Sequence, residues 1–218
     1  MQTRREGNVH VVDFGDGENR VDAAFIAGLS QAIDAVESSP RPRALVTTGS
    51  GRFYSNGLDL DQIRALPPVE AARTLSRFDQ LLGRLLAAPF VTVAAVNGHC
   101  YAAGALVALA HDFRVMRVDR GYFCLPSVDV GIPFTTGMTR LVTAKIPPPL
   151  SQTLVVSGSR ISGAEAQRGG AVHEAVAASD VLPRAIALAE ELSDKDPETL
   201  GTIKRRMYQP VLEHIETS

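Results

Sequence analysis

The sequence has no tryptophan and only two cysteines among its 218 residues. These two, Cys100 and Cys124, cannot build the disulfide framework that stabilises small secreted domains, and no pair of Cys and His residues has the spacing of a zinc site. We therefore expect neither a disulfide-stapled fold nor a bound metal. Without tryptophan, the packing of sheets against helices has to depend on Leu, Val, Ile and Phe.

Long apolar runs and an excess of charge of one sign are also absent. The formal net charge is −2, so no basic surface field is available to hold a nucleic-acid backbone or an anionic membrane. The apolar run at residues 105–110 is much shorter than the ~20 residues that span a bilayer. Residues 1–6 lead into no signal-peptide core. These absences predict a cytoplasmic protein without a nucleic-acid or membrane partner.

What is present is typical of a globular protein with a sizeable core, because 45% of the residues are hydrophobic and 21% are charged. Residues 8–14 alternate like a strand, and Asp22 can cap a helix whose apolar residues recur at helical spacing. A short buried strand at residues 44–48 follows. This strand–helix–strand order indicates an α/β fold, and further helices and strands alternate at residues 72–86, 90–96, 102–110 and 113–117.

Two segments, residues 52–66 and 126–137, have no clear period and are predicted to be loops of a functional kind. Later elements are expected at residues 121–125 (strand), 138–145 (helix), 162–168 (helix with a capping box), 171–176 (strand), 182–192 and 198–208 (helices). The sequence thus predicts one core over residues 1–180 and a helical C-terminal appendage over residues 181–218.

Two glycine-bearing loops follow buried strands, at residues 49–60 and 97–104. Gly57 has no side chain, so the backbone of the first loop can come close to whatever lies at the carboxyl end of the strand. The second loop leads into the N-terminus of a helix of small residues. Such loops can bring two N–H donors to one developing oxyanion, although both can also be ordinary tight turns. Neither loop has a phosphate-binding glycine pattern, which disfavours a nicotinamide or nucleoside-triphosphate enzyme.

Several ordered motifs resemble the enoyl-CoA hydratase/isomerase (crotonase) superfamily. They are Phe53-Tyr-Ser-Asn-Gly-Leu-Asp-Leu60, residues 94–112 with Asn97-Gly98 and Ala103-Gly104, Val128-Asp-Val-Gly-Ile-Pro133, and residues 157–166. Ser55-Asn56-Gly57 and residues 117–121 are most similar to the branch that isomerises 3-enoyl-CoA to 2-enoyl-CoA. The resemblance implies a ββα spiral core with C-terminal helices, a homotrimer or dimer of trimers, and an acyl-CoA thioester as partner. It implies no separate cofactor, because coenzyme A is carried by the substrate.

The resemblance also assigns site residues. It places the two oxyanion-hole amides on Leu58 and Ala103, and such a donor is worth ~3–4 kcal/mol in other enzymes. Lys204, on the last helix, is expected near coenzyme A. The residues implied to bind coenzyme A or the acyl group are Arg52, Asn56, Asp59, Leu60, Tyr101 and Pro126, with Arg52 a phosphate contact and Tyr101 a wall of the acyl pocket.

The two glutamates of hydratases in this family are replaced by Leu106 and Ser127. Neither side chain exchanges a proton near neutral pH, which disfavours hydration. The usual glutamate of the family's isomerases also falls at Ser127, so the motifs assign no group to the proton transfer between the α and γ carbons. A second family position for a carboxylate falls at residues 134–136, which are not ionisable either. Ser127 and Asp129 are the candidates for the proton-transfer group, since on an extended segment they share a face. Asp129 can equally be a structural hydrogen-bonding residue, and a dyad of His99 and Cys100 is disfavoured because adjacent side chains point apart.

Three functions fit these features. The first is an enzyme of the enoyl-CoA hydratase/isomerase type in fatty-acid metabolism, with isomerisation favoured over the lyase reaction of hydratases. The second is an acyl-CoA-binding protein without catalysis, and the third is another enolate reaction such as decarboxylation, which needs no base. The sequence ends soon after Pro210, so we expect a shortened tail, a more open acyl pocket and weaker trimer contacts.

Overall fold

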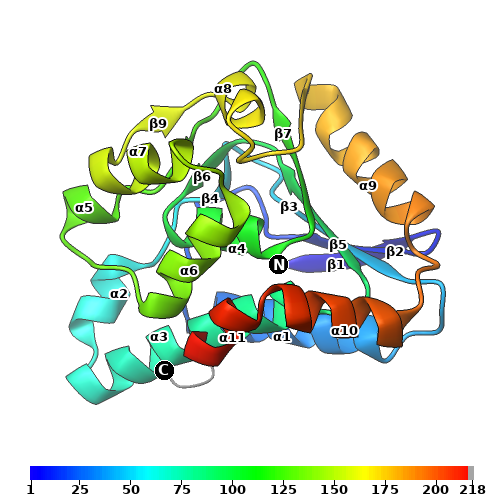
Figure 1. Ribbon diagram of the computed structural model, residues 1–218, viewed down its shortest axis with the longest axis horizontal. Helices are drawn as coiled ribbons and strands as arrows, with labels where there is room; N and C mark the ends of the chain where they lie inside the picture. The colour runs from blue at the N-terminus through cyan, green and yellow to red at the C-terminus, as the bar shows by residue number, and fades with distance from the viewer. Residues whose placement is uncertain (216–218) are drawn as a thin grey trace.

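The structure, a computed structural model, describes residues 1–215 and contains two sheets (Figure 1). In the larger, six-stranded sheet all neighbouring strands are parallel except β1, which is antiparallel to β2. Its strands, in spatial order, are β1 (Gln2–Glu6), β2 (Val9–Asp13), β3 (Ala44–Thr48), β5 (Val91–Val96), β7 (Phe113–Arg117) and β10 (Glu174–Val176).

The smaller sheet has four short strands: β4 (Phe53–Ser55), β6 (His99–Tyr101), β8 (Phe123–Cys124) and the antiparallel β9 (Arg160–Ile161). Along the chain, β3 leads to β4, β5 to β6, and β7 to β8. Each pair is followed by helix: α2 (Leu60–Ala65) and α3 (Pro68–Leu86), then α4 (Ala103–Ala110), then α5 (Ser127–Val130). These three repeats form the ββα spiral that the sequence motifs predicted.

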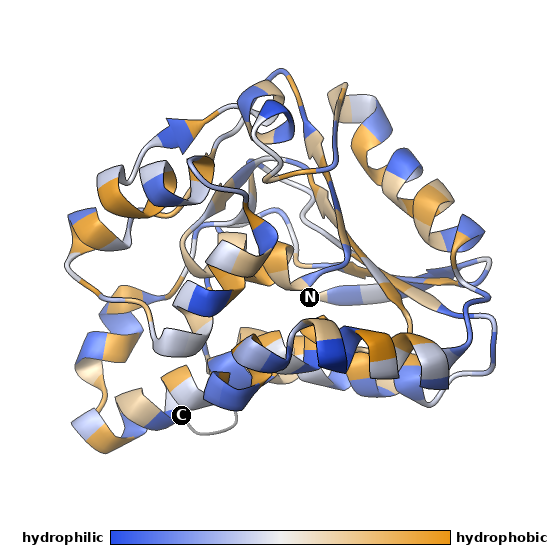
Figure 2. Ribbon diagram, viewed as in Figure 1, coloured by the Kyte–Doolittle hydropathy of each residue, from blue (hydrophilic) through white to orange (hydrophobic). Residues whose placement is uncertain are grey.

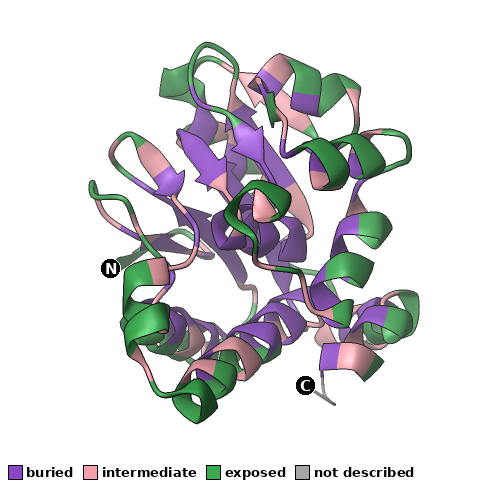
Figure 3. Ribbon diagram, turned by 90° about the vertical axis from the view of Figure 1, so that its left-hand side faces the viewer, coloured by how far each residue is buried: buried purple, intermediate pink, exposed green. Residues whose placement is uncertain are grey.

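The central strands β2, β3, β5 and β7 of the larger sheet are buried on both faces, which explains their nearly continuous apolar residues. Side chains alternate along each strand, so Leu45 of β3 joins the main core while Ala44 and Val46 join a second, smaller core. The main core is shared with α1 (Ala23–Glu37), α3 and α4, whereas α9 (Val181–Glu191) covers the other face. Figure 2 shows hydrophobic and hydrophilic residues alternating around α9, and Figure 3 shows the buried strands and α4 inside a shell of exposed helices.

The remaining helices are α6 (Thr136–Lys145), α7 (Leu150–Ser157), α8 (Gly163–Arg168), α10 (Pro197–Met207) and α11 (Gln209–Ile215). The helix α11 packs on α3 and α6, so the C-terminal segment contributes to the main core. The division at residue 180 stays a prediction. Within residues 1–215, no helix has both the length and the hydrophobicity needed to cross a bilayer.

The side chain of Lys204 is an anchor of α10 and is not available at the surface. It is 4% exposed, and its Nζ donates to Asp112 Oδ2 at 2.6 Å and to the carbonyls of Ala88 and Phe90 at 3.0 and 2.8 Å. The alternative interpretation of Lys204 as part of a solvated helix face is therefore wrong, because all three ammonium hydrogens are used inside the fold. Its proximity to coenzyme A, in its own or a neighbouring subunit, stays a prediction.

Candidate active site

The three parallel strands of the smaller sheet end at one edge, and a loop with functional residues follows each. Gly57 and Leu58 come after β4, Ala102 and Ala103 after β6, and Pro126 and Ser127 after β8. Ligands of α/β proteins bind outside the carboxyl ends of parallel strands, since the following loops converge there. The smaller sheet therefore brings together segments that are about seventy residues apart in the sequence, from 57 to 127.

Gly57 allows the first two of these loops to touch. Its φ is +93°, a conformation that side chains disfavour, and a Cβ placed there would lie 2.8 Å from Ala102 Cβ and 3.1 Å from the Tyr101 carbonyl oxygen. The same position is 3.5 Å from the amide nitrogen of Ala103. The glycine thus sets the close spacing between the amide of Ala103 and the backbone at Leu58.

The amide of Leu58 points away from the strand segment beside it. Val21 N–H donates to the Gly57 carbonyl at 2.8 Å, and Asp59 N–H donates to the Val21 carbonyl at 3.2 Å. In this parallel bridge between Val21 and Leu58, both bonds use the neighbours of Leu58, so its own N–H faces the opposite direction. Leu58 also lines a cavity.

Ala103 presents the second amide. It is the first residue of α4, and the first N–H groups of a helix have no partner within the helix. Ala102, immediately before it, has a φ of +48°, which is unusual for a residue with a side chain. Gly104 packs so closely on Ser55 that a Cβ would lie 2.5 Å from the Ser55 Cβ. Backbone strain and glycine packing therefore hold the Ala103 amide in the cavity wall.

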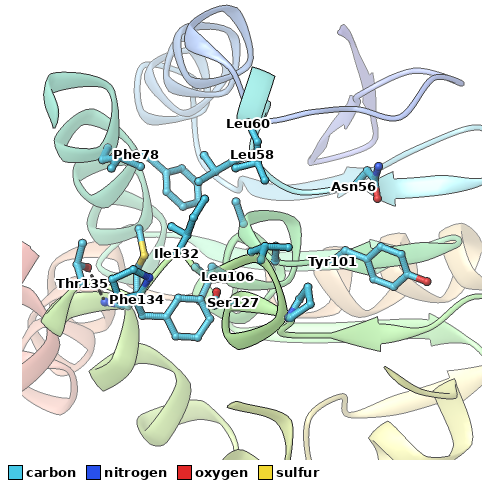
Figure 4. Close-up of a pocket in the computed structure, with 17 residues that line it drawn as sticks. Asn56, Leu58, Leu60, Phe78, Tyr101, Leu106, Ser127, Ile132, Phe134 and Thr135 are labelled. Carbon is cyan, nitrogen blue, oxygen red and sulfur yellow. Dashed lines mark hydrogen bonds between the residues drawn. The ribbon is translucent and has the colours of Figure 1, made fainter. Parts of the chain in front are cut away.

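The cavity itself has a volume of about 220 Å³ and is mostly apolar (Figure 4). None of its lining residues, all within the described part of the chain, carries a carboxylate, an imidazole or an ammonium group. Its walls come from the loop after β4, from α3, from the start of α4 and from residues 126–138. The lining residues are Asn56, Leu58, Leu60, Leu75, Phe78, Tyr101, Ala102, Ala103, Leu106, Pro126, Ser127, Val130, Ile132, Pro133, Phe134, Thr135 and Met138.

Leu106 and Ser127 both line this cavity, as expected for positions that share one site (Figure 4). Asp129 does not line it. The prediction of an extended segment here is wrong, because residues 127–130 form the helix α5, in which side chains two positions apart point to different sides. The Asp129 side chain is exposed and lies against Gly158, where a Cβ would approach its Oδ2 to 2.3 Å.

The residues predicted to bind coenzyme A divide into two groups. Asn56, Leu60, Tyr101 and Pro126 line the cavity, and Figure 4 shows Asn56 and Tyr101 together at one end of it. Asp59 does not line it; it caps α2 by accepting a hydrogen bond from Gln62 N–H at 3.1 Å.

Arg52 lies outside the cavity. It precedes β4 and lines a separate surface groove with His99 and Arg120, at the opposite edge of the smaller sheet. Its guanidinium lies 5.4 Å from the Phe53 ring centre. A contact between Arg52 and a phosphate of coenzyme A stays a prediction.

Sequence reasoning missed most of the far wall of the cavity, which includes Leu75, Phe78 and Met138, and it noted Thr135 only within a family carboxylate position that is not ionisable here. Leu75 and Phe78 belong to the apolar stripe of α3, which we interpreted as core only.

Behind this wall lies Asp79, which is fully buried and accepts a hydrogen bond from Thr135 Oγ1 at 3.4 Å. Burial raises the pKa of Asp79 to about 6, against the smaller opposing effect of the hydrogen bond from Thr135. A carboxylate inside an apolar helical stripe was the signal that could have identified it.

Comparison with known proteins decides the family. The sequence profile described as "Enoyl-CoA hydratase/isomerase" matches residues 4–217. The chain belongs to the enoyl-CoA hydratase/isomerase family. It is 34% identical over 203 residues to enoyl-CoA delta isomerase 3 of Arabidopsis thaliana, covering 89% of this chain and 85% of that one.

Solved structures of this family have the same fold. An enoyl-CoA isomerase of Mycobacterium tuberculosis and an enoyl-CoA hydratase of Mycobacterium marinum each superpose with a TM-score of 0.89 at 25% identity, covering 99% of this chain and 94% of theirs. These likenesses confirm the crotonase fold predicted from the motifs. They also confirm an enzyme of the hydratase/isomerase type, with names of both reactions among the relatives.

Proposed function

We propose that this enzyme isomerises 3-enoyl-CoA to 2-enoyl-CoA in fatty-acid metabolism. The proposal depends on two features of one apolar cavity. The backbone at Leu58 and Ala103 converges on it, and the two positions at which hydratases have glutamates, Leu106 and Ser127, bring no carboxylate to it. Hydration needs an acid and a base to deliver the elements of water. Isomerisation needs one group that takes a proton from C2 and delivers one to C4, so a single proton carrier at the Ser127 position is enough.

In this mechanism the thioester oxygen of the substrate lies between the N–H groups of Leu58 and Ala103. Loss of a proton from C2 moves the C–H electron pair into the conjugated system and leaves a negative charge on that oxygen. The two amides stabilise this charge without reorganisation, since the backbone already holds them in place. Protonation at C4 then returns the electron pair to a C–H bond and gives the 2-enoyl thioester.

The proton carrier in this proposal is a water molecule held by the hydroxyl group of Ser127, because the hydroxyl group itself does not ionise near neutral pH. Ser127 stands where the family has a glutamate, and the wall of the cavity offers no carboxylate in its place. This water molecule takes the proton from C2 and exchanges it with solvent. The proton delivered to C4 therefore comes from solvent, in contrast to a shuttle by one enclosed carboxylate.

The remaining parts of the proposal concern coenzyme A and assembly. The nucleotide end of the substrate leaves the cavity past Asn56 and Tyr101, and coenzyme A enters and leaves with the substrate, so no separate cofactor is required. A homotrimer or dimer of trimers is supported by the exposed apolar residues Val128, Val130 and Val156 on α5 and α7. The cytoplasmic location stays a prediction.

Incubation of the protein with 3-enoyl-CoA and with 2-enoyl-CoA in D₂O tests this proposal. We expect interconversion of the two thioesters, deuterium at C4 of the 2-enoyl product, and no 3-hydroxyacyl-CoA. Water addition without isomerisation would contradict the isomerase assignment. Isomerisation with complete retention of the substrate proton would contradict the role of Ser127 and water.

Decarboxylation is the second candidate, and the absence of a carboxylate from the cavity wall favours it. Loss of carbon dioxide from a malonyl-type thioester leaves its electron pair on the α-carbon, so the enolate forms without a base and the two amides suffice. Release of carbon dioxide from such a thioester, with no turnover of either enoyl-CoA, would replace the isomerase assignment by this one. Binding of thioesters without any turnover would indicate a non-catalytic acyl-CoA-binding protein.

A further inference from the structure

Asp79 is a buried carboxyl group with an unmet hydrogen-bonding capacity. Its side chain on α3 is 0% exposed, and within the described residues Oδ2 has no hydrogen-bond partner. Oδ1 accepts a single bond, from Thr135 Oγ1 at 3.4 Å. Burial of a carboxylate with so few partners costs free energy, and buried polar groups of this kind usually have a function or a missing partner.

Thr135 connects this carboxyl group to the acyl cavity. The residue lines the cavity, and its Oγ1 both donates to Asp79 and accepts a hydrogen bond from Met138 N–H at 3.1 Å. A hydroxyl oxygen has two lone pairs and one hydrogen, so one lone pair of Thr135 stays free for a ligand. Because Thr135 donates its hydrogen to a carboxylate, its oxygen is a strengthened acceptor in the chain of hydrogen bonds.

The position of Thr135 defines which part of a ligand it meets. Figure 4 shows Thr135 at the opposite end of the cavity from Asn56 and Tyr101, with Ser127 and Leu106 between them. Under the proposed function, on which this inference rests, the thioester lies at Leu58 and Ala103. The acyl chain then runs along apolar residues towards Phe78, Met138 and Thr135. The hydroxyl of Thr135 therefore meets the distal end of the acyl chain.

We propose that the Asp79–Thr135 pair selects acyl groups that carry a hydrogen-bond donor, such as a hydroxyl group, at their distal end. The donor of the ligand binds the free lone pair of Thr135 Oγ1, and Asp79 strengthens that acceptor from behind. A plain alkyl chain of equal length leaves the lone pair of Thr135 unpaired in an enclosed site. The cost of an unpaired buried acceptor makes the discrimination larger than the gain of the bond alone.

A purely structural role for the same pair makes different predictions. Thr135 is the N-cap of α6, and a carboxylate near the amide end of a helix stabilises that helix. If Asp79 and Thr135 served only this purpose, their substitution would lower the stability of the fold. It would then change the affinity for hydroxylated and alkyl ligands by the same factor. The ratio of the two affinities, and not either affinity alone, is therefore the informative quantity.

The experiment measures this ratio by calorimetric titration of the full-length protein. The ligands are pairs of saturated acyl-CoA thioesters of matched length, with and without a hydroxyl group on the terminal carbon, over a series of chain lengths. In the wild type we expect the hydroxylated member to bind about tenfold more tightly at the length that reaches Thr135. Equal affinities at every length would overturn the proposal.

Three variants test whether the preference for the hydroxylated ligand comes from the Asp79–Thr135 pair. Thr135→Val removes the hydroxyl at constant shape, and we expect the alkyl ligand to bind more tightly than its hydroxylated twin. Thr135→Ser keeps both the hydroxyl and the helix cap and should keep the preference. Asp79→Asn removes only the charge and should reduce the preference to about threefold. A preference that persists in Thr135→Val, or disappears in Thr135→Ser, would contradict the assignment.

A ligand pair without coenzyme A separates this inference from the proposed function. We expect 1-hexanol to bind the wild-type cavity more tightly than heptane, which has the same number of heavy atoms, as followed by NMR shifts of the Thr135 and Met138 methyl groups. The order should reverse in Thr135→Val. If thioesters fail to bind and this reversal is still seen, the proposed function fails and the selective pair stands. If thioesters are isomerised and no reversal is seen, only the present inference fails.

Discussion

At the scale of single residues, the contact between Gly57 and Ala102 determines the spacing of the two amides. In Gly57→Ala the added methyl group would lie 2.8 Å from Ala102 Cβ at a φ of +93°. We expect the loops to separate and kcat/KM for isomerisation to fall about 100-fold, since small displacements of positioned groups have effects of that size. Gly131→Ala is the matched control, because its φ is +70° but no atom lies within 4 Å of the added Cβ. Equal losses in both variants would show that backbone strain alone is responsible.

Ser127 is the residue at which a proton carrier can be restored. Ser127→Glu places a carboxyl group in an apolar wall, where burial raises its pKa towards neutrality and makes it an effective base. We expect kcat for isomerisation to rise at least about tenfold and deuterium incorporation from D₂O to fall. Hydratase activity should stay absent because Leu106 still occupies the other glutamate position. Ser127→Gln has the same size without the base and should show neither change.

The motifs predicted the backbone groups of the site better than its side-chain environment. The resemblance to the family placed the two amides on Leu58 and Ala103, whereas the glycine pattern alone also fitted ordinary tight turns. Asp79 was not identified, and Thr135 was noted only within the family carboxylate position at residues 134–136. Their relationship depends on the packing of α3 against the start of α6, which is a tertiary contact between segments that share no motif. Arg52 directly precedes the motif at residues 53–60 and Asp59 lies within it, but neither side chain lines the cavity.

At the scale of secondary-structure elements, length decided what could be predicted. The strand at residues 44–48, the strand at 113–117 and the capped helix α1 show several periods of apolar residues, and the structure confirms them. The strands β4, β6 and β9 have two or three residues, and α5 has four, which is too short for a period to be visible. The edge strand β1 is exposed throughout, so its residues QTRRE lack the apolar alternation of a half-buried strand. The helices α2, α7 and α11 were missed as well.

Lys145, the last residue of α6, connects this helix to two other elements. Its Nζ donates to the His111 carbonyl at 3.1 Å and lies 4.3 Å from the centre of the Tyr208 ring. Burial lowers the pKa of Lys145 from 10.5 to about 7; Arg114 and Lys204 lower it further, while Asp112 opposes the shift. Between these two values the unfolded chain binds a proton that the folded chain does not. The resulting penalty on the folded state is complete below about pH 7 and vanishes as the pH rises through 10.5.

We therefore predict that Lys145→Met stabilises the fold by an amount that depends on pH. We expect the free energy of unfolding of the wild type, relative to that of the variant, to rise with pH between about 7 and 10.5. Urea denaturation at several pH values measures this difference. Lys195→Met, at an exposed lysine, is the control and should show no such trend. A difference that is constant with pH would mean that Lys145 stays protonated in the fold.

At the scale of the whole molecule, the two sheets have separate tasks. The larger sheet is enclosed by two cores and supplies rigidity, whereas the smaller sheet turns its strand ends and loops towards the cavity. Because each loop of the site follows a different repeat of the spiral, the repeats have to be packed together before the two amides can meet. The chemistry of the site therefore depends on the complete core and not on any one motif.

Assembly is the last property to be tested at this scale. Val156 on α7 is 68% exposed and Val128 on the adjacent α5 is 55% exposed, so this face presents apolar side chains that a second copy of the chain can cover. We expect sedimentation analysis to show a trimer or hexamer for the wild type and smaller species for Val156→Asp. Val69→Asp is the matched control, since Val69 on α3 is 64% exposed and lies outside this face. If both variants sediment like the wild type, the subunits associate through another surface; if the wild type is monomeric, the predicted trimer is wrong.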